Sequence, residues 1–176
     1  VGNVNPAKGH RDLLEAVPDV LEEFSDANFL IVGSQLDSQQ PYFKELQETI
    51  SRLGIEDAVQ FTGWRSDAPE LLSLFDLFVL PSVTEACPIV VLEAMAMRCT
   101  VVATDVGGVT EQLPSEEYGW VVQPEKPHIL SEAIIQSLRF DSSRQKRGEN
   151  ARSRAENLFS IEHCVASHFS VYNSLE

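Results

Sequence analysis

The stretch Ser82-Val-Thr-Glu-Ala-Cys-Pro-Ile-Val-Val-Leu-Glu-Ala-Met-Ala-Met97 decides how the rest of the chain is interpreted. It follows an apolar run of strand length, residues 75–80, and leads through a polar turn into helix-forming residues. Pro88 suits the first position of that helix, because its missing N–H costs nothing there. The pattern predicts a strand, a loop and a helix whose first free N–H groups, on Ile89 and Val90, face the loop. Such a helix start suits an anion such as a phosphate.

Glu93 is the only polar residue between Ile89 and Met97. A helix that is apolar nearly all round usually packs inside a domain, where a carboxylate is costly without hydrogen-bond donors. Two hydroxyls of a bound ligand could donate to Glu93, and Glu85 in the loop could contact a second polar part of that ligand. The alternative is that Glu93 points into solvent and that Glu85 or Thr84 caps the helix. The residues alone leave both interpretations open.

Composition limits the functions that the chain can have. A chain of 176 residues with 43% hydrophobic residues can bury one ordinary core. Its formal net charge of −14 argues against a nucleic-acid-binding surface. The three cysteines form no Cys-x-x-Cys pair, which predicts free thiols in a reducing, cytoplasmic compartment. No apolar run reaches membrane-spanning length, and Val1 is not a natural start, so we expect the chain to begin inside a longer protein.

Motifs of several other site classes are absent from the sequence. There is no Gly-x-Gly-x-x-Gly, no Gly-x4-Gly-Lys-Ser/Thr and no Gly-x-Ser-x-Gly, so neither dinucleotide binding, a P-loop nor a hydrolase nucleophile is indicated. His163 and His168 lack the spacing that places two metal ligands on one helix face. No Asp-x-Asp pair is present to clamp a metal-bound diphosphate. We therefore expect no metal site.

Short apolar segments alternate with helical segments along most of the chain. The remains of a first strand are expected at residues 1–4, and further strands at residues 29–32, 58–62, 75–80, 100–104 and 119–122. Helices are expected at residues 10–24, 41–53, 67–74, 88–97 and 127–138. Apolar strands separated by helices predict an α/β fold with a doubly wound, Rossmann-like parallel sheet. In such sheets ligands bind beyond the carboxyl ends of the strands. The residues that follow the expected strand ends are Lys8, Gly33, Trp64, Arg65 and Glu85.

The tail is expected to be helical. We predict a sheet domain over residues 1–140 and C-terminal helices over residues 141–176. Five basic side chains in residues 144–154 are expected on a solvated helix face, with weak contact to a membrane surface as the alternative. Apolar residues then recur at helical spacing, namely Ile161, Val165, Phe169 and Tyr172.

Glu85 and Glu93 match the Glu-x7-Glu motif of retaining glycosyltransferases with the two-domain GT-B fold. The chain resembles the glycosyl transferase group 1 family, which includes glycogen-synthase-like enzymes. The other matching motifs fall in family order and are Gly2, Lys8-Gly9, Ile31-Val-Gly33, Phe61-Thr-Gly63, Leu80-Pro-Ser82, Leu92-Glu-Ala-Met-Ala96, Val101-Val-Ala-Thr-Asp105, Gly107-Gly108 and Gly119. The resemblance implies one half of a GT-B fold, the donor-binding domain, whose final helix packs toward the N-terminal domain of the same protein.

The resemblance implies a retaining, metal-independent hexosyltransferase that needs no cofactor. Its donor would be a nucleotide-sugar such as a UDP- or GDP-sugar, and its acceptor a saccharide or a lipid-linked molecule. Glu93 would hold the ribose hydroxyls and Glu85 the donor sugar. Lys8 would bind the diphosphate, together with the amides of Ile89 and Val90, and stabilise it as the leaving group.

The resemblance also implies roles for the loops after the second and third expected strands. Gly33 would let a ligand approach the backbone closely, or is simply a turn glycine. Trp64 and Arg65 lie in the loop that passes near the nucleotide base in the family, and surface packing is the alternative for both.

Asn3 departs from the family pattern, because many relatives carry an arginine there. The departure removes a bidentate phosphate donor, which the Asn3 amide could replace only in part. Two other functions therefore stay open. One is a nucleotide-sugar-binding module without catalysis, which Asn3 favours. The other is a nucleotide-sugar epimerase on the same fold, whose catalytic acids and histidine are not evident here.

Overall fold

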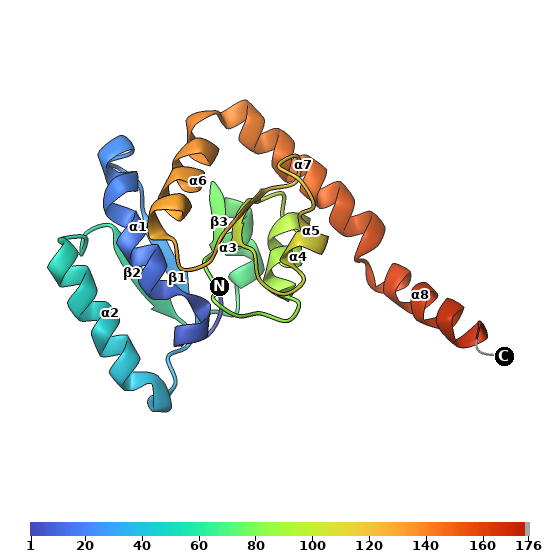
Figure 1. Ribbon diagram of the computed structural model, residues 1–176, viewed down its shortest axis with the longest axis horizontal. Coiled ribbons are helices and arrows are strands. Elements are labelled where there is room, and N and C mark those ends of the chain that lie inside the picture. The colour runs from blue at the N-terminus through green and yellow to red at the C-terminus, as the bar shows by residue number, and fades with distance from the viewer. Residues whose placement is uncertain (175–176) are drawn as a thin grey trace.

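A computed structural model describes residues 1–174 as strands wrapped by helices (Figure 1). The strands are β1 Phe29–Val32, β2 Val59–Gly63, β3 Leu77–Leu80, β4 Thr100–Thr104 and β5 Trp120–Val122. The helices are α1 His10–Glu23, α2 Gln40–Leu53, α3 Ala68–Leu74, α4 Ile89–Ala96, α5 Val109–Gln112, α6 Pro127–Arg139, α7 Asp141–Leu158 and α8 Ile161–Asn173, with short 3-10 helices η1 Pro6–Lys8 and η2 Asp37–Gln39.

All strand pairs are parallel, as the apolar strand pattern predicts, but the strands form two sheets. β1 pairs with β2, and β3, β4 and β5 form a second sheet in that order. The expected strand at residues 1–4 is wrong: only an isolated bridge joins Val4 to Gln35. Gly2 and Val4 donate N–H groups to the carbonyls of Val32 and Ser34, both at 2.8 Å. Residues 1–4 contact only the carboxyl end of β1 and the residues just after it, and their two hydrogen bonds are too few for a strand.

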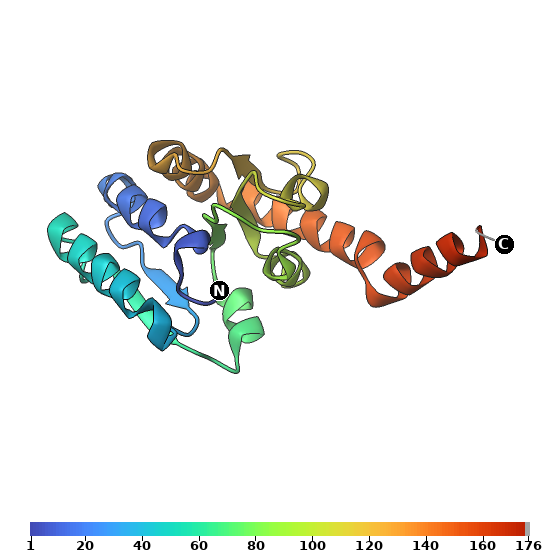
Figure 2. The same cartoon turned by 60° about the horizontal axis from the view of Figure 1, so that its bottom comes forward.

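Helices cover both faces of the strands, as a doubly wound fold requires. Leu13 and Val20 of α1 pack with Val102 of β4 and with Ile134 of α6 on one face. On the other face, α4 and α7 pack against β3 and β4. Figure 2 shows α1 and α6 on one side of the strands and α3 and α4 on the other. The α/β architecture is therefore confirmed.

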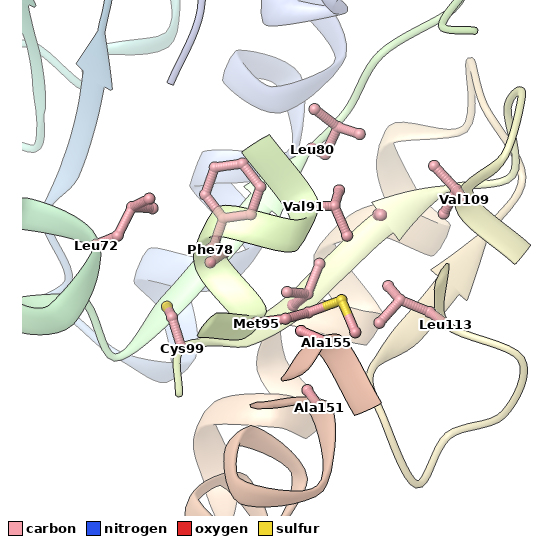
Figure 3. Packing of buried hydrophobic residues seen from close by; sticks show 13 residues of the cluster. Leu72, Phe78, Leu80, Val91, Met95, Cys99, Val109, Leu113, Ala151 and Ala155 are labelled. Carbon is pink, nitrogen blue, oxygen red and sulfur yellow. The ribbon is translucent and has the colours of Figure 1, made fainter. Parts of the chain in front are cut away.

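The core around β3 and β4 holds α4 in place (Figure 3). Val91 and Met95 of α4 are completely buried against Phe78 of β3 and Leu113, which follows α5. Ala155 of α7 closes the same cluster. α4 is therefore held on several sides, although it is only two turns long.

A second core lies under β1 and β2. Leu14 and Val17 of α1 pack with Ile31 of β1 and with Leu46 of α2. Gly54 follows α2 with φ 66°, the left-handed conformation that glycine commonly adopts just after a helix. This core is separate from the one around α4.

The basic residues of α7 are not simply solvated, which corrects the expectation for this segment. Arg144 is only 15% exposed in its side chain and donates to Asp76 and to the carbonyl of Leu138. Arg147 lies over the Trp120 ring, and Arg154 donates to the carbonyl oxygens of α5. The expected helix thus forms, but Arg144, Arg147 and Arg154 hold it against its own domain.

α8 differs from α7, because none of its residues is buried. It projects away from the rest of the molecule (Figures 1 and 2). The stripe of Ile161, Val165, Phe169 and Tyr172 is exposed. Where the chain divides into domains stays a prediction.

Candidate functional site

Lys8 and Glu85, which are 77 residues apart in the sequence, meet in an ion pair. The ammonium nitrogen of Lys8 lies 2.7 Å from Oε1 of Glu85. The hydroxyl of Ser82 donates to the same oxygen at 2.8 Å. The side chains of Lys8 and Glu85 are 28% and 12% exposed. The structure thus brings together the two residues to which the family resemblance assigns the catalytic roles, Lys8 at the leaving diphosphate and Glu85 at the donor sugar.

The loops that carry this pair are joined backbone to backbone. Val83 and Thr84 donate their N–H groups to the carbonyl oxygen of Ala7 at 2.8 and 3.3 Å. Gly9 has φ 63°, and a Cβ there would lie 1.8 Å from the carbonyl oxygen of Pro81. Because only glycine fits this approach, Gly9 sets the distance between the Lys8 loop and the Glu85 loop.

A second glycine turn supports the Glu85 loop from behind. A Cβ on Gly107, which has φ 53°, would lie 2.4 Å from the carbonyl oxygens of Glu85 and Ala86. Gly108 donates its N–H to Ala86 at 2.8 Å. The sequence alone predicts no positioning role for Gly107 or Ser82. The adjacent glycine pair just after a strand was the available signal.

The start of α4 lies directly after the Glu85 loop. The helix begins at Ile89, and Pro88 precedes it as the N-cap, which corrects the expectation that Pro88 is the first helical residue. Val91 donates back to the carbonyl of Pro88 at 3.1 Å, so the N–H groups of Ile89 and Val90 are the ones left free of helical partners. Gln112 donates to the same carbonyl at 3.2 Å and holds the helix start in place.

Glu93 lies one turn further along α4 and is exposed, so the idea that it is enclosed in apolar surroundings is wrong. Within residues 1–174 its carboxylate forms no hydrogen bond or ion pair, which leaves both oxygens free.

Gly33 has a structural role in this arrangement. Its φ is 151°, and a Cβ there would lie 1.8 Å from the carbonyl oxygen of Gly2. A Cβ on Gly2 would in turn contact Cε of Lys8 at 3.6 Å. The close approach at Gly33 is thus made by the backbone segment that lies against the Lys8 side chain.

Trp64 and Arg65 lie on the loop after β2, and neither hydrogen-bonds to the Lys8–Glu85 pair. Trp64 is 73% exposed. Arg65 donates to both carboxylate oxygens of Asp67, at 2.7 and 2.5 Å, and these hydrogen bonds lower the pKa of Asp67. Both side chains are at the surface.

Asn3 is exposed, and its carbonyl oxygen accepts a hydrogen bond from the Asn5 side chain at 3.4 Å. No side-chain hydrogen bond holds the Asn3 amide within residues 1–174.

Within residues 1–174, no group of three or more Asp, Glu, His or Cys side chains is arranged so that it could hold a metal ion. Cys87, Cys99 and Cys164 are free thiols. No helix in the described part of the chain is both long and apolar enough to span a bilayer.

Comparison with known proteins places these residues in a family context. The chain is 29% identical over 98% of its length to an N-acetyl-alpha-D-glucosaminyl L-malate synthase of Bacillus anthracis, of which the match covers 44%. It is 33% identical over 86% of its length to an alpha-D-kanosaminyltransferase of Streptomyces kanamyceticus, of which the match covers 38%. The chain thus spans less than half the length of these two relatives.

Among solved structures, Anabaena Alr3699/HepE in complex with UDP matches with a TM-score of 0.91 and 28% identity, over 98% of this chain and 48% of that one. The same protein has also been solved in complex with UDP-glucose. The neighbours are GT-B glycosyltransferases, so one half of a GT-B fold is the architecture of this chain. The model of the glycosyl transferases group 1 family matches residues 1–154, and the chain belongs to that family.

Proposed function

We propose that this chain is the donor-binding half of a retaining, nucleotide-sugar-dependent glycosyltransferase. The observation that carries the proposal is the Lys8–Glu85 contact of 2.7 Å beside the free amides at the start of α4. A cation, two N–H donors and a carboxylate lie there within one group of loops, which matches the needs of a sugar diphosphate. A structural ion pair alone would not need a helix start beside it.

Lys8 and α4 would together hold the diphosphate. The Lys8 ammonium has three N–H donors, and its contact with Glu85 uses one of them. The remaining donors, with the amides of Ile89 and Val90, can reach phosphate oxygens, and the helix start adds a favourable partial charge. When the bond between the sugar and the diphosphate breaks, these groups stabilise the negative charge on the leaving diphosphate. In this proposal the chain performs that task without a metal ion.

The two acids would bind the rest of the donor. Glu93 offers two unpaired carboxylate oxygens, which suit the paired hydroxyls of a ribose. Glu85 is fixed by Lys8 and Ser82 through one oxygen, so its other oxygen can accept from a hydroxyl of the donor sugar. Trp64 would lie near the base. A uridine nucleotide is the first donor to test, because Anabaena Alr3699/HepE was solved with UDP and with UDP-glucose.

The acceptor, a saccharide or a lipid-linked molecule, would bind largely to an N-terminal domain of the same protein. The exposed apolar stripe of α8 offers a surface for that domain. Any contact with a membrane surface would be weak, because Arg144, Arg147 and Arg154 are engaged within their own domain. Alone, the chain should bind donor but hardly transfer sugar.

The test is a calorimetric titration of the chain with UDP, GDP and their glucose and mannose derivatives. We expect Lys8→Ala to raise the Kd of the diphosphates by about tenfold or more, since it removes a charge-assisted contact of about 1.5–3 kcal/mol. Glu93→Gln should raise the Kd of UDP and the Kd of UDP-glucose by about the same factor. Lys44→Ala is the matched control, because Lys44 lies on α2 with a side chain that is 77% exposed. Equal affinities for all variants would contradict the proposal.

A binding module without catalysis is the second candidate, and the exposed, neutral Asn3 favours it. In a longer protein that carries the acceptor half, Asn3→Arg should restore a bidentate phosphate contact. A rise in turnover would identify a weakened enzyme, and NMR of the product anomer would then test retention. Tight donor binding with no turnover in either form would identify a binding module.

A further inference from the structure

Gln112, the last residue of α5, is a polar residue in apolar surroundings. It is only 1% exposed. Its neighbours Val109 and Leu113 are both buried in the core around β3 and β4 (Figure 3). Glutamine is mostly found at protein surfaces, because a buried side-chain amide needs hydrogen-bond partners for its donor and its acceptor. The amide of Gln112 must therefore find its partners inside the domain.

Only the donor half of that amide has partners. Nε2 of Gln112 donates to the carbonyl oxygen of Pro88 at 3.2 Å and to Sγ of Cys87 at 3.5 Å. Oε1 of Gln112 is buried and has no hydrogen-bond partner within residues 1–174. The contact with Pro88 fixes which way the amide lies, because a carbonyl oxygen can accept only from the nitrogen. A buried acceptor without a donor lowers stability, so an apolar side chain at this position should be at least as stable.

The carbonyl of Pro88 does not depend on Gln112 for a hydrogen bond. The N–H of Val91 donates to the same oxygen at 3.1 Å. Removal of the Gln112 amide would therefore leave no unpaired carbonyl at the start of α4. Stability alone gives no reason for a buried glutamine that supplies a second donor to this oxygen.

The contact does act on the next residue, through the peptide bond. The carbonyl of Pro88 and the N–H of Ile89 belong to one planar trans peptide unit, in which they point in opposite directions. A side chain that holds the oxygen therefore also holds the direction of the Ile89 N–H. Donation to the oxygen also polarises the peptide unit, which makes its N–H a stronger donor. Ile89 is 67% exposed, and its N–H has no helical partner.

We propose that Gln112 is a positioning residue for the donor diphosphate, because it orients and strengthens the Ile89 N–H that would bind a phosphate oxygen. This role rests on the proposed function, in which that N–H is one of the diphosphate donors. The N–H of Val90 belongs to the next peptide unit, whose oxygen is that of Ile89. Gln112 should therefore act on the Ile89 donor and not on the Val90 donor.

The test replaces Gln112 by methionine, which has a similar length and no N–H donor. Calorimetry measures the Kd of UDP, pyrophosphate and uridine. We expect Gln112→Met to raise the Kd of UDP and of pyrophosphate by about fivefold or more, since hydrogen bonds to charged groups are the strong ones. The Kd of uridine, which has no phosphate, should stay the same, and Tm should stay equal or rise. Gln47→Met is the matched control, because Gln47 is an exposed glutamine of α2, and it should change none of these values.

A second readout follows the amide itself. In ¹H–¹⁵N NMR spectra without ligand, Gln112→Met should shift the amide signal of Ile89 more than that of Val90. Gln112→Leu is measured in parallel, so that the result does not depend on how one replacement side chain fits the core. An unchanged Ile89 signal in both variants would overturn the proposal.

The binding data separate this proposal from the proposed function. If Lys8→Ala weakened UDP binding while Gln112→Met and Gln112→Leu bound UDP as tightly as the unchanged chain, only the role of Gln112 would be overturned. If the unchanged chain bound neither UDP nor pyrophosphate, both would be overturned. A fall in Tm with an equal loss of affinity for uridine would assign Gln112 a merely structural role, and would also overturn the proposal.

Discussion

The strands form two pieces, a two-stranded piece of β1 and β2 and a three-stranded piece of β3, β4 and β5, and these carry different parts of the candidate site. The three-stranded piece holds Glu85 and the start of α4 over a continuous core in which Val91 and Met95 are completely buried. The two-stranded piece ends in a loop whose Trp64 is 73% exposed and whose Arg65 is paired only with Asp67. One piece therefore holds its functional groups rigidly, and the other presents them at the surface.

The difference matches what each part of a nucleotide-sugar would require. A diphosphate leaving group needs donors fixed in advance, because donors that must reorganise stabilise developing charge poorly. A base can be bound by an exposed aromatic ring on a loop whose sequence tolerates substitution. The contrast predicts that substitutions at the junction of the two pieces damage the whole molecule, while substitutions at the Trp64 loop change selectivity alone.

The largest effect is expected at the junction, from Gly9→Ala. Its Cβ would lie 1.8 Å from the carbonyl oxygen of Pro81, so the two loops must separate. Gly54→Ala is the matched control, because φ is 63° at Gly9 and 66° at Gly54, but nothing lies within 4 Å of a Cβ at Gly54. In urea unfolding we expect a loss of about 4 kcal/mol or more for Gly9→Ala and about 1 kcal/mol for the control. Equal losses would mean that the two loops are not held together by this contact.

The next effect is the pH dependence caused by His10, which is buried near the same junction. Burial chiefly lowers its pKa to about 4 from the ordinary 6.5. Between these values the unfolded state binds more protons, so His10 should lower stability by about 3 kcal/mol as pH falls from 6.5 to 4. Urea unfolding at several pH values should show a smaller acid loss in His10→Gln. An unchanged pH profile in that variant would assign the acid loss to other groups.

A smaller effect is expected from Ser82→Ala in the three-stranded piece. Ser82 is completely buried, and its hydroxyl donates to Glu85 at 2.8 Å. Loss of this bond should lower the free energy of unfolding by about 1–2 kcal/mol and weaken donor binding, because Glu85 loses one of its two supports. Ser73→Ala is the control, since the Ser73 hydroxyl is exposed and bonds only to the carbonyl of Glu70. Urea unfolding and donor titration measure these two changes. If Ser82→Ala matched Ser73→Ala in both the free energy of unfolding and the donor Kd, this role of Ser82 would be rejected.

The smallest effect on stability is expected from Trp64→Ala in the two-stranded piece. An exposed side chain of this kind should change the free energy of unfolding by less than about 0.5 kcal/mol. The ratio of the Kd values for UDP and GDP should nevertheless change, because stacking on the ring differs between the two bases. Calorimetry on both nucleotides measures this ratio. A large loss of stability with an unchanged ratio would reverse the contrast between the two pieces.

The sequence predicts the parallel α/β order well, because short apolar strands and amphipathic helices are local patterns. It fails at residues 1–4, where strand formation depends on how many backbone hydrogen bonds a neighbouring strand offers and not on composition. It also fails for the arginines of α7, because their partners at Asp76, Trp120 and α5 come from distant parts of the chain. Polar residues in a helix give no signal of which distant groups they will meet.

By itself, the sequence determines that Glu85 follows a strand and that a helix with free N–H groups begins near residue 89, since strand ends, prolines and apolar runs are local patterns. Only the tertiary structure decides that Lys8 pairs with Glu85 and that Glu93 is exposed on α4. It also decides that Gly9, Gly33 and Gly107 set the spacing of the loops. The physical reason is that these features depend on backbone approaches of a few ångströms between segments far apart in the chain, which strand order and packing fix together.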